Sequence, residues 1–417
     1  MKADLIAVAI LTIGDEILYG QTLDTNSQWM SSELDSFGFT VVHRATVSDK
    51  EADILRGLAD ASSWADIVLI TGGLGPTADD LTKPCLAKYF DVPLQSNPAA
   101  LEELRVLFQQ LDKELSESNI AQTNLPANAD YISNSLGTAP GLWIEDKGKI
   151  YVSMPGVPFE MKSMISNHVI PRLQNIYDLP TVSHKIIKTI GIGESWLAEK
   201  IAPWEQNLPE SIKLAYLPSL GQVKLRLTSS GKDKPALEAA INEQVKSLIP
   251  YAEKYIYGYD GDVIEQVIGD LINEKSLTLG TAESCTGGYL AHLITSIAGS
   301  SSYFKGSIIA YANEVKESAL GVSSNTLEEY GAVSEETIIE MARGVQKQLG
   351  VDIGIATSGI AGPDGGTKDK PVGTIWIAIA IGDEVKTRQL KLFKDRLLNI
   401  KMTAVSSLAM LWRILSK

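Results

Sequence analysis

Strand-like and helix-like patterns alternate along the first part of this chain, and this alternation narrows the folds open to it. Apolar runs typical of β-strands and runs with helical spacing follow one another in the order 5–12, 25–37, 39–47, 52–64 and 66–71. The order strand, helix, strand, helix, strand predicts a mainly parallel sheet covered by helices. Ligands of such sheets bind beyond the carboxyl ends of the strands, so the loops that follow strands are the first places to look for function.

The last part of the chain shows the same alternation, and a short region between the two parts differs from both. Strands are predicted near 277–282, 304–311, 352–358 and 372–381, and helices near 263–274, 286–297, 334–349 and 396–415. The middle region has a strand at 185–190, a helix from about Trp196, two strands at 213–216 and 222–228, and a helix at 235–248, which predicts a small α+β module. The turn-rich stretch 257–262 is interpreted as a linker. A chain of 417 residues accommodates two or three domains, here predicted at 1–175, 178–256 and 260–417.

Charge and cysteine content exclude several classes of function. The net charge of −14 disfavours direct binding to nucleic acid or to an anionic membrane. The two cysteines, Cys85 and Cys285, lie in different predicted domains, which argues against a disulfide framework or a structural zinc site. The first twelve residues resemble a strand rather than a signal peptide, and no apolar run approaches the roughly 20 residues of a membrane span. We therefore expect a cytoplasmic protein.

A serine and a cysteine stand side by side after the apolar run 277–282. Ser284 and Cys285 precede Gly287 and Gly288, and a helical pattern then begins. A nucleophile at this position lies at a helix N-terminus, where free backbone N–H groups can hold an oxyanion. Cys285 is the rival nucleophile or, alternatively, a small buried apolar residue.

A serine nucleophile needs a base, and none of the four histidines lies in a recognisable serine-triad motif. Lys316 follows the predicted strand 304–311 and is the better candidate, provided that burial or nearby cations lower its pKa. Tyr311 is placed to orient the lysine or the serine. The alternatives are a solvated helix lysine and a core aromatic residue.

Further polar residues are candidates for contacts to a substrate. The glycine-rich segment 357–366 again follows a strand, and its Ser358 and Gly359 offer a hydroxyl and a backbone N–H group. Ser301 belongs to a second hydroxyl-rich turn. Arg396 begins the last helix and is a candidate phosphate clamp, because Arg pairs with phosphate through two hydrogen bonds.

A second glycine-rich loop, at 71–80, follows a predicted buried strand in the first domain. Its glycines let backbone N–H groups turn toward an anion, and Pro76 is predicted to start a helix that also faces the anion. Asp79 and Asp80 are hard oxygen ligands suited to a divalent ion that bridges phosphates, and Glu16 and Asp24 would complete the shell. The alternative is that the two aspartates only stabilise a helix start. The loop lacks the Walker pattern, which disfavours a kinase or ATPase. Two more loops, 134–141 and 154–160, are expected at the same site.

Taken together, these motifs resemble the competence/damage-inducible CinA family over essentially the whole chain. The first domain resembles the molybdopterin-binding-like domain of that family through segments 14–18, 24–26, 71–80, 137–141 and 155–158. The last domain resembles its nicotinamide mononucleotide deamidase domain through segments 282–288, 298–301, 311–316, 331–334 and 358–366. The middle segment resembles the KH-like insertion of the family more weakly. The resemblance implies a three-layer α/β/α first domain, a small α+β middle domain and an α/β amidase domain.

For the last domain, the resemblance implies hydrolysis of nicotinamide mononucleotide to nicotinate mononucleotide and ammonia without a metal. Ser284 would be the nucleophile, Lys316 the general base and Tyr311 its helper. Substrate contacts would come from Gly287, Gly288, Ser301, Ser358, Gly359 and Arg396.

For the first domain, the resemblance implies cleavage of ADP-ribose to AMP and ribose 5-phosphate. The reaction would need a divalent metal (Co, Mn or Mg) and K⁺, with Asp79, Asp80, Glu16 and Asp24 as metal ligands. Nucleotide contacts would come from Asn26, Thr71, Gly72, Gly73, Gly75, Thr77 and Gly156. The family also implies a homodimer.

Two other functions remain open at this point. The first domain would be only a binding module for a pterin or nucleotide, or the whole protein would be an adaptor that recruits a recombination protein in competence. The negative charge argues against direct DNA binding by such an adaptor but not against a protein partner.

Overall fold

The computed structural model describes residues 6–77 and 79–416. Backbone contacts divide the chain into two compact units, one made of residues 1–183 and 230–237 and the other of residues 184–229 and 238–417. Leu5 of the first predicted strand, Ala78 of the glycine-rich loop and Lys417 of the last predicted domain lie outside the described residues.

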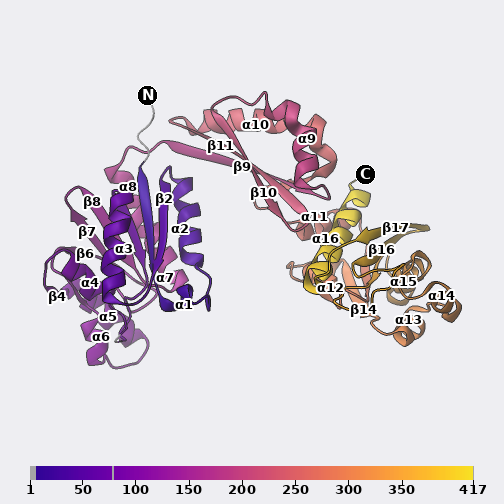
Figure 1. Ribbon diagram of the computed structural model, residues 1–417, viewed down its shortest axis with the longest axis horizontal. Coiled ribbons are helices and arrows are strands. Elements are labelled where there is room, and N and C mark those ends of the chain that lie inside the picture. Colours follow the sequence, from indigo (N-terminus) through magenta and orange to yellow (C-terminus); the bar gives the residue numbers. More distant parts are fainter. Residues whose placement is uncertain (1–5, 78, 417) are drawn as a thin grey trace. The chain divides into compact units, whose positions relative to one another are not determined.

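The N-terminal unit is built on a six-stranded sheet with the strand order β2-β1-β3-β8-β7-β6 (Figure 1). Its strands are β1 (Ala7–Ile13), β2 (Thr40–Val47), β3 (Ile67–Thr71), β8 (Lys149–Met154), β7 (Gly141–Asp146) and β6 (Ala129–Ile132). The first four strands run parallel, as the alternation of patterns predicts, whereas β7 and β6 join as an antiparallel extension.

Helices cover both faces of this sheet and give the three-layer α/β/α fold that was predicted. Helices α2 (Thr25–Ser36), α7 (Pro158–Met164), η1 (Ile165–Val169) and α8 (Ile170–Ile176) lie on one face, and α3 (Glu51–Trp64) and α4 (Thr82–Tyr89) lie on the other. Alternate residues of β1 point into the two cores: Val8 and Ile10 into the first, and Ala9 and Leu11 into the second. Shorter elements complete the unit: α1 (Asp15–Leu18), β4 (Leu94–Ser96), α5 (Pro98–Gln110), α6 (Glu117–Ala121) and β5 (Asn124–Pro126).

The middle region forms a four-stranded sheet in the order β10-β11-β9-β12, packed against two helices. Its elements are β9 (Thr181–Ile190), α9 (Glu194–Glu205), β10 (Ile212–Ser219), β11 (Gln222–Gly231), α10 (Lys234–Ala252), η2 (Glu253–Tyr255) and β12 (Ile256–Tyr259). The interpretation of 257–262 as a linker is therefore wrong in part, because Tyr259 pairs with Ile187 as part of an edge strand. Glycine and aspartate in this stretch concealed a strand of only four residues.

The C-terminal region holds a five-stranded sheet in the order β14-β13-β15-β16-β17. Its strands are β13 (Leu279–Glu283), β14 (Phe304–Ile309), β15 (Ile353–Gly359), β16 (Thr374–Ile381) and β17 (Glu384–Lys391). Strands β14, β13 and β15 run parallel, and β16 and β17 extend the sheet as an antiparallel hairpin. The sequence analysis missed β17, whose pattern of exposed polar residues is that of an edge strand.

Helices again cover both faces of this sheet. Helices α11 (Ile264–Glu274), α12 (Tyr289–Thr295) and α16 (Arg396–Leu415) pack on one face, and α13 (Asn313–Leu320) and α15 (Glu335–Leu349) pack on the other. The short elements η3 (Ser300–Ser302) and α14 (Ser324–Tyr330) lie in the connections. Because β13 and β14 are parallel neighbours, the residues that follow them, Ser284 and Tyr311, come to the same edge of the sheet.

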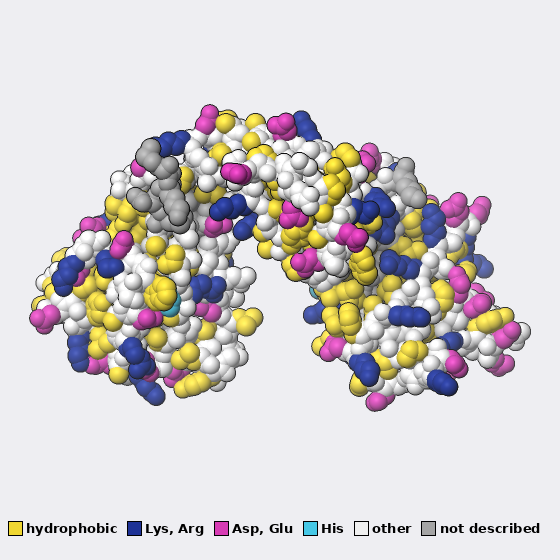
Figure 2. Space-filling model, turned by 45° about the horizontal axis from the view of Figure 1, so that its top comes forward, with side chains coloured by type: hydrophobic (Ala, Val, Ile, Leu, Met, Phe, Trp, Pro, Cys, Tyr) yellow, Lys and Arg dark blue, Asp and Glu magenta, His cyan; other side chains and the backbone are white. Residues whose placement is uncertain are grey.

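The surface carries side chains of both charge signs. On the face drawn in Figure 2, basic and acidic side chains are interspersed over the molecule. No helix in the described part of the chain combines the length and the apolar composition that a membrane span requires.

Candidate functional site

Ser284 lies directly beyond the end of β13, in a tight turn between strand and helix. Its backbone N–H donates to the carbonyl oxygen of Thr357 at 2.9 Å, which ties the turn to the neighbouring strand β15. Gly287 and Gly288 have φ values of 59° and 98°, in the left-handed region that suits glycine. The side chain is 8% exposed, so Ser284 is buried but accessible from one side.

Lys316 of α13 is the partner of this serine. Its Nζ atom lies 3.2 Å from Ser284 Oγ, 2.9 Å from the carbonyl oxygen of Ala310 and 3.3 Å from that of Tyr311. A neutral amine has two N–H groups and one lone pair. As an ammonium, Lys316 donates to all three oxygens; in the neutral form, with two N–H groups donated to the carbonyl oxygens, its lone pair would face the hydroxyl of Ser284.

Burial favours the neutral form that this arrangement needs. Lys316 is only 1% exposed, and burial lowers the pKa of its amine below the usual 10.5. The negative charge of Glu314 acts in the opposite direction and raises this pKa. The sequence could place Lys316 after a strand, but only the fold shows that its side chain is buried against the serine.

The backbone N–H groups at the start of α12, beyond Ser284, are already hydrogen-bonded to a side chain. The prediction that they would hold an oxyanion is therefore wrong. The carboxylate of Glu283 accepts hydrogen bonds from the backbone N–H groups of Gly288, Leu290 and Ala291 at 2.8–3.0 Å. These are the donors of α12 that were expected to hold an oxyanion. In the described part of the chain, the backbone N–H groups of Cys285 and Thr286 donate to no backbone carbonyl oxygen, which leaves these two as candidates for that role.

Cys285 does not have the environment of a reactive thiol. Its side chain packs among Ala361, Ile375, Ile377 and Leu390 in an apolar cluster. Burial raises the pKa of the thiol to about 12, so the thiolate is scarce near neutral pH. The geometry therefore favours Ser284 over Cys285 as the nucleophile.

Tyr311 and Arg396 meet beside the serine. The Arg396 guanidinium donates to Tyr311 Oη at 2.7 Å and to the carbonyl oxygen of Gly362 at 2.8 Å. The Tyr311 side chain is 60% exposed, and the residue contacts the Lys316 amine through its backbone carbonyl rather than through its phenol. Arg396 and Tyr311 are both exposed and thus mark the open side of the site.

Two of the other predicted substrate contacts fall at this edge, and one does not. Ser358 and Gly359 end β15, next to the turn that holds Ser284, although the Ser358 hydroxyl is buried and donates to the carbonyl oxygen of Ala332 at 2.7 Å. Ser301 lies in η3, before the start of β14, and is therefore at the opposite edge of the parallel sheet from Ser284. The prediction that Ser301 contacts the substrate is wrong for a site formed within one chain, because nearness in a hydroxyl-rich motif does not say at which strand end a residue lies.

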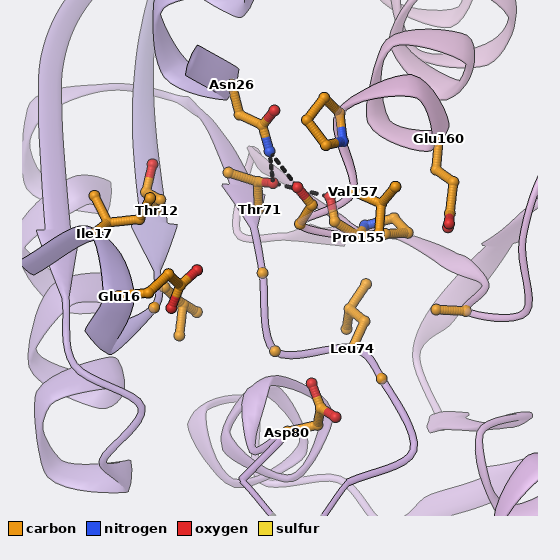
Figure 3. Close-up of a pocket in the computed structure, with 18 of the residues that line it drawn as sticks. Thr12, Glu16, Ile17, Asn26, Thr71, Leu74, Asp80, Pro155, Val157 and Glu160 are labelled. Carbon is orange, nitrogen blue, oxygen red and sulfur yellow. Dashed lines mark hydrogen bonds between the residues drawn. The ribbon is translucent and has the colours of Figure 1, made fainter. Parts of the chain in front are cut away.

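A pocket of about 470 Å³ lies at the carboxyl ends of the strands in the N-terminal unit (Figure 3). Its size is typical of small-molecule sites. Each of the loops expected there contributes to the wall: Glu16, Asp24, Asn26, Thr71, Gly72, Gly73, Gly75, Asp79, Asp80, Thr138, Pro155, Gly156 and Glu160.

The floor of this pocket is held by short contacts between loops. Asn26 donates to Thr71 Oγ1 at 3.2 Å and to the carbonyl oxygen of Gly156 at 2.7 Å, and Thr71 donates in turn to the carbonyl oxygen of Pro155 at 3.0 Å (Figure 3). Gly72 has a φ of 107°, and a β-carbon there would lie 2.1 Å from the carbonyl oxygen of Ile13. This position therefore admits only glycine.

Three further expectations about the pocket need correction. Pro76 does not start a helix, because α4 begins at Thr82. Thr77 is not part of the pocket wall; its backbone N–H and hydroxyl donate to the carboxylate of Asp80. Asp24, which was expected to bind a metal, instead caps the start of α2. Its carboxylate accepts hydrogen bonds from Thr12 Oγ1 at 2.8 Å and from the N–H and hydroxyl of Ser27.

The carboxylates of Glu16, Asp79 and Asp80 could hold a divalent ion only if a bound ligand supplied further oxygen atoms. Glu16, Asp79 and Asp80 line the same pocket, yet within residues 6–77 and 79–416 no group of three or more metal-binding side chains is close enough to hold an ion. Mg²⁺ and similar ions are often held by one or two carboxylates and the phosphates of a substrate. The donor set fits that kind of binding and does not fit a preformed metal cage.

Three residues of the two sites were not singled out from the sequence. Gln122 and Glu160 line the N-terminal pocket, and Glu283 caps α12 beside the nucleophile. Gln122 follows a short helix in a segment without glycine, so no glycine loop marks it in the sequence. Glu283 and Glu160 stand inside noted motifs, but only the fold shows which groups they contact.

Family models match three consecutive segments of the chain. The model described as "CinA C-terminal domain" matches residues 262–415, "Damage-inducible protein CinA KH domain" matches residues 184–258, and "Probable molybdopterin binding domain" matches residues 9–175.

Curated relatives match along nearly the full length. A CinA-like protein of Cytophaga hutchinsonii is 50% identical over 98% of this chain and 98% of its own length. A putative competence-damage inducible protein of Halothermothrix orenii is 41% identical over 97% of this chain and 98% of its own. Among solved structures, a competence/damage inducible protein of Agrobacterium tumefaciens is 34% identical, with a TM-score of 0.36, over 37% of this chain and 94% of that one.

Proposed function

This chain belongs to the CinA family, and from that premise we propose that it is a hydrolase with two sites for pyridine nucleotides. The C-terminal site would convert nicotinamide mononucleotide to nicotinate mononucleotide and ammonia. The N-terminal site would cleave ADP-ribose to AMP and ribose 5-phosphate. The observation that carries the first activity is the 3.2 Å approach of a buried lysine amine to Ser284 Oγ.

The deamidation would proceed through an acyl-enzyme. Ser284 Oγ attacks the carboxamide carbon while its proton passes to the neutral Nζ of Lys316. The tetrahedral intermediate collapses with cleavage of the C–N bond, and Lys316 returns the proton to the leaving nitrogen, which departs as ammonia. Water, deprotonated by Lys316, then hydrolyses the ester and frees the carboxylate and Ser284. Side chains carry every proton in this sequence, so it has no step for a metal.

The surrounding groups would stabilise and position the substrate. The backbone N–H groups of Cys285 and Thr286 supply donors for the oxyanion, in a turn held rigid by Glu283. The guanidinium of Arg396 at the open side would pair with the phosphate of the mononucleotide. Tyr311 orients that guanidinium through its hydroxyl.

The proposal is tested by ammonia release from nicotinamide mononucleotide in the presence of a chelator. Wild type and Cys285→Ala should be active, whereas Ser284→Ala and Lys316→Met should be inactive while unfolding at the same temperature as the wild type. Activity retained in Ser284→Ala and lost in Cys285→Ala would make the cysteine the nucleophile. A wild-type protein that releases no ammonia would refute the deamidase assignment.

The proposal for the N-terminal site rests on the pocket of about 470 Å³, which is lined by a glycine loop and by the carboxylates of Glu16, Asp79 and Asp80. The backbone of the loop at Gly72–Gly75 would bind the pyrophosphate, and Asp79, Asp80 and Glu16 would hold a divalent ion, which neutralises pyrophosphate charge when bound. Release of AMP from ADP-ribose should require added Mg²⁺, Mn²⁺ or Co²⁺.

A second function for this domain is favoured by the family model for a probable molybdopterin-binding domain. In that case the pocket would bind a pterin or a nucleotide without cleaving it. Binding of ADP-ribose with no AMP release under any of the three metals would support this second function.

A further inference from the structure

Gln122 lines the N-terminal pocket and has a buried amide with no partner among the described residues. The residue is 2% exposed and forms part of the pocket wall. Neither its amide oxygen nor its amide nitrogen has a hydrogen-bond partner within the described residues. Most buried polar side chains are hydrogen-bonded, so an amide with both ends free beside a pocket marks a position where a ligand completes the bonding.

The backbone of Gln122 is fixed in relation to the glycine-rich loop. The buried amine of Lys83 donates to the carbonyl oxygen of Gln122 at 2.7 Å. Lys83 is the second residue of α4, and the first, Thr82, donates through its hydroxyl to the carbonyl oxygen of Gly72 at 2.8 Å. The backbone at Gln122 is thus tied through α4 to the loop expected to bind the pyrophosphate, which limits the reorganisation that binding requires.

The chemistry of an amide limits what the ligand can be. Gln122 offers a donor and an acceptor side by side in one plane. A phosphate group offers acceptors alone and a metal ion accepts only lone pairs, so each would leave one end of the amide unpaired. A planar heterocycle that carries an amine beside a ring nitrogen satisfies both ends, as glutamine does when it pairs with adenine.

We infer that Gln122 recognises the nucleobase: its amide pairs with the donor–acceptor edge of a planar heterocycle bound in the N-terminal pocket. In ADP-ribose this group is the adenine ring. This inference rests on the proposed function of the domain and adds a specificity-determining residue to it. A pterin has an edge of the same kind, so the two sources of the heterocycle are separate arms of the test.

A second unpaired atom in the same pocket is consistent with this reading. The amide nitrogen of Asn26 is bonded to Thr71 and Gly156, but its oxygen is buried without a partner among the described residues. Figure 3 shows this oxygen directed away from Thr71. A ribose hydroxyl is a donor of the kind that this oxygen lacks.

The experiment compares the wild type with Gln122→Met, which has similar volume and neither polar atom. Binding of AMP, of purine riboside 5′-monophosphate (which lacks the exocyclic amine), of ribose 5-phosphate and of neopterin is measured by titration calorimetry. The matched control is Gln95→Met, a glutamine at an exposed position of β4 in the same unit.

The wild type should bind AMP roughly tenfold more tightly than the purine analogue, and Gln122→Met should bind the two equally. Ribose 5-phosphate should bind both proteins alike. Because the substitution removes two unpaired buried atoms, the melting temperature without ligand should stay the same or rise. Gln95→Met should behave as the wild type does.

Other results overturn the inference or redirect it. Unchanged AMP affinity in Gln122→Met, in a protein that cleaves ADP-ribose, would refute the role of Gln122 and leave the proposed function standing. If Gln122→Met loses affinity equally for AMP and for ribose 5-phosphate and also melts at a lower temperature, Gln122 has a structural role. That result would also refute the inference. If the wild type binds neopterin but not AMP, and Gln122→Met loses neopterin, base recognition by Gln122 stands while the ADP-ribose assignment fails. A wild type that binds neither heterocycle would overturn both.

Discussion

Burial lowers the pKa of two lysines of this protein, with different consequences for each. Lys316 has its amine beside Ser284, and Lys83 has its amine on the carbonyl oxygen of Gln122. Burial lowers the pKa of both, to about 8 for Lys83. At Lys316 the neutral amine is the reactive base. At Lys83 the protonated amine, present below its pKa, destabilises the folded protein.

The deamidation rate should depend on pH through Lys316. The neutral amine is the base, so kcat should rise with pH and level off once the pKa of Lys316 is passed, at a pH below the ordinary 10.5 of a lysine. Glu314 raises this pKa, so Glu314→Gln should shift the rising limb to lower pH. Glu317→Gln on the same helix serves as the control and should leave the limb in place. A rising limb that does not move in Glu314→Gln would contradict Lys316 as the titrating base.

Stability should depend on pH through Lys83. The unfolded chain holds this proton up to about the ordinary pKa of 10.5, and the folded chain only up to about 8. The folded state is therefore penalised below about pH 8, and the penalty disappears as the pH rises to 10.5. The free energy of unfolding of the wild type, relative to Lys83→Met, should increase by about 3 kcal/mol over this range. Urea denaturation at the two ends measures it. A difference that stays constant with pH, as expected for the exposed Lys113→Met control, would contradict the prediction.

At the scale of elements, the turn between β13 and α12 is organised by a carboxylate rather than by the nucleophile. Glu283 is completely buried, and its side chain bonds three N–H groups at the start of a helix of seven residues. Such a short helix is not stable by itself, so this cap and the packing of Leu290 and Ile294 determine its position.

Removal of this cap should cost more than removal of an exposed one. Glu283→Ala leaves three donors without their acceptor and should lower the free energy of unfolding by about 3 kcal/mol, with loss of deamidation. The exposed cap of α16, Asp395, accepts one hydrogen bond among the described residues, from Leu398 N–H, and Asp395→Ala should cost about 1 kcal/mol. Chemical denaturation measures both. Equal costs for the two substitutions would mean that Glu283 does not organise the turn.

At the scale of the whole molecule, the two sites lie in different compact units. The pocket at the glycine loop is built from residues of the first unit, and the serine and lysine belong to the second. Each site has its own sheet and its own helices, so each should work without the side chains of the other.

A single substitution in one site should therefore reduce the activity of that site and leave the activity of the other site unchanged. Asp80→Asn should reduce metal-dependent AMP release from ADP-ribose at least about tenfold and leave ammonia release unchanged, because it removes one carboxylate of the pocket. Ser284→Ala should have the converse effect. Both activities are assayed on the same preparations. Loss of both activities in either variant, in a protein that remains folded, would show that the two sites depend on each other.

The local pattern of the sequence was sufficient for the type and order of most elements. A period of about 3.6 residues identifies helices where the core contacts one side, as in α2 and α15, and a short continuous apolar run identifies a strand buried on both faces, as in β1. Glycine loops after buried strands then located both sites at the strand ends, because parallel strands present their carboxyl ends at one edge. Short or polar edge strands such as β12 and β17 were not predicted, because they bury too few apolar side chains to show a hydrophobic period.

Tertiary structure decided which groups meet. The sequence determined that Ser284 and Lys316 each follow a strand, but the parallel pairing of β13 and β14 brings them to 3.2 Å and buries the amine. The same pairing places Ser301 at the far edge. The partners of Glu283 and the unpaired amide of Gln122 depend likewise on contacts between segments distant in the chain or on the exact path of a turn. Local periodicity carries no information about such distances, because register and packing are set only when the whole sheet assembles.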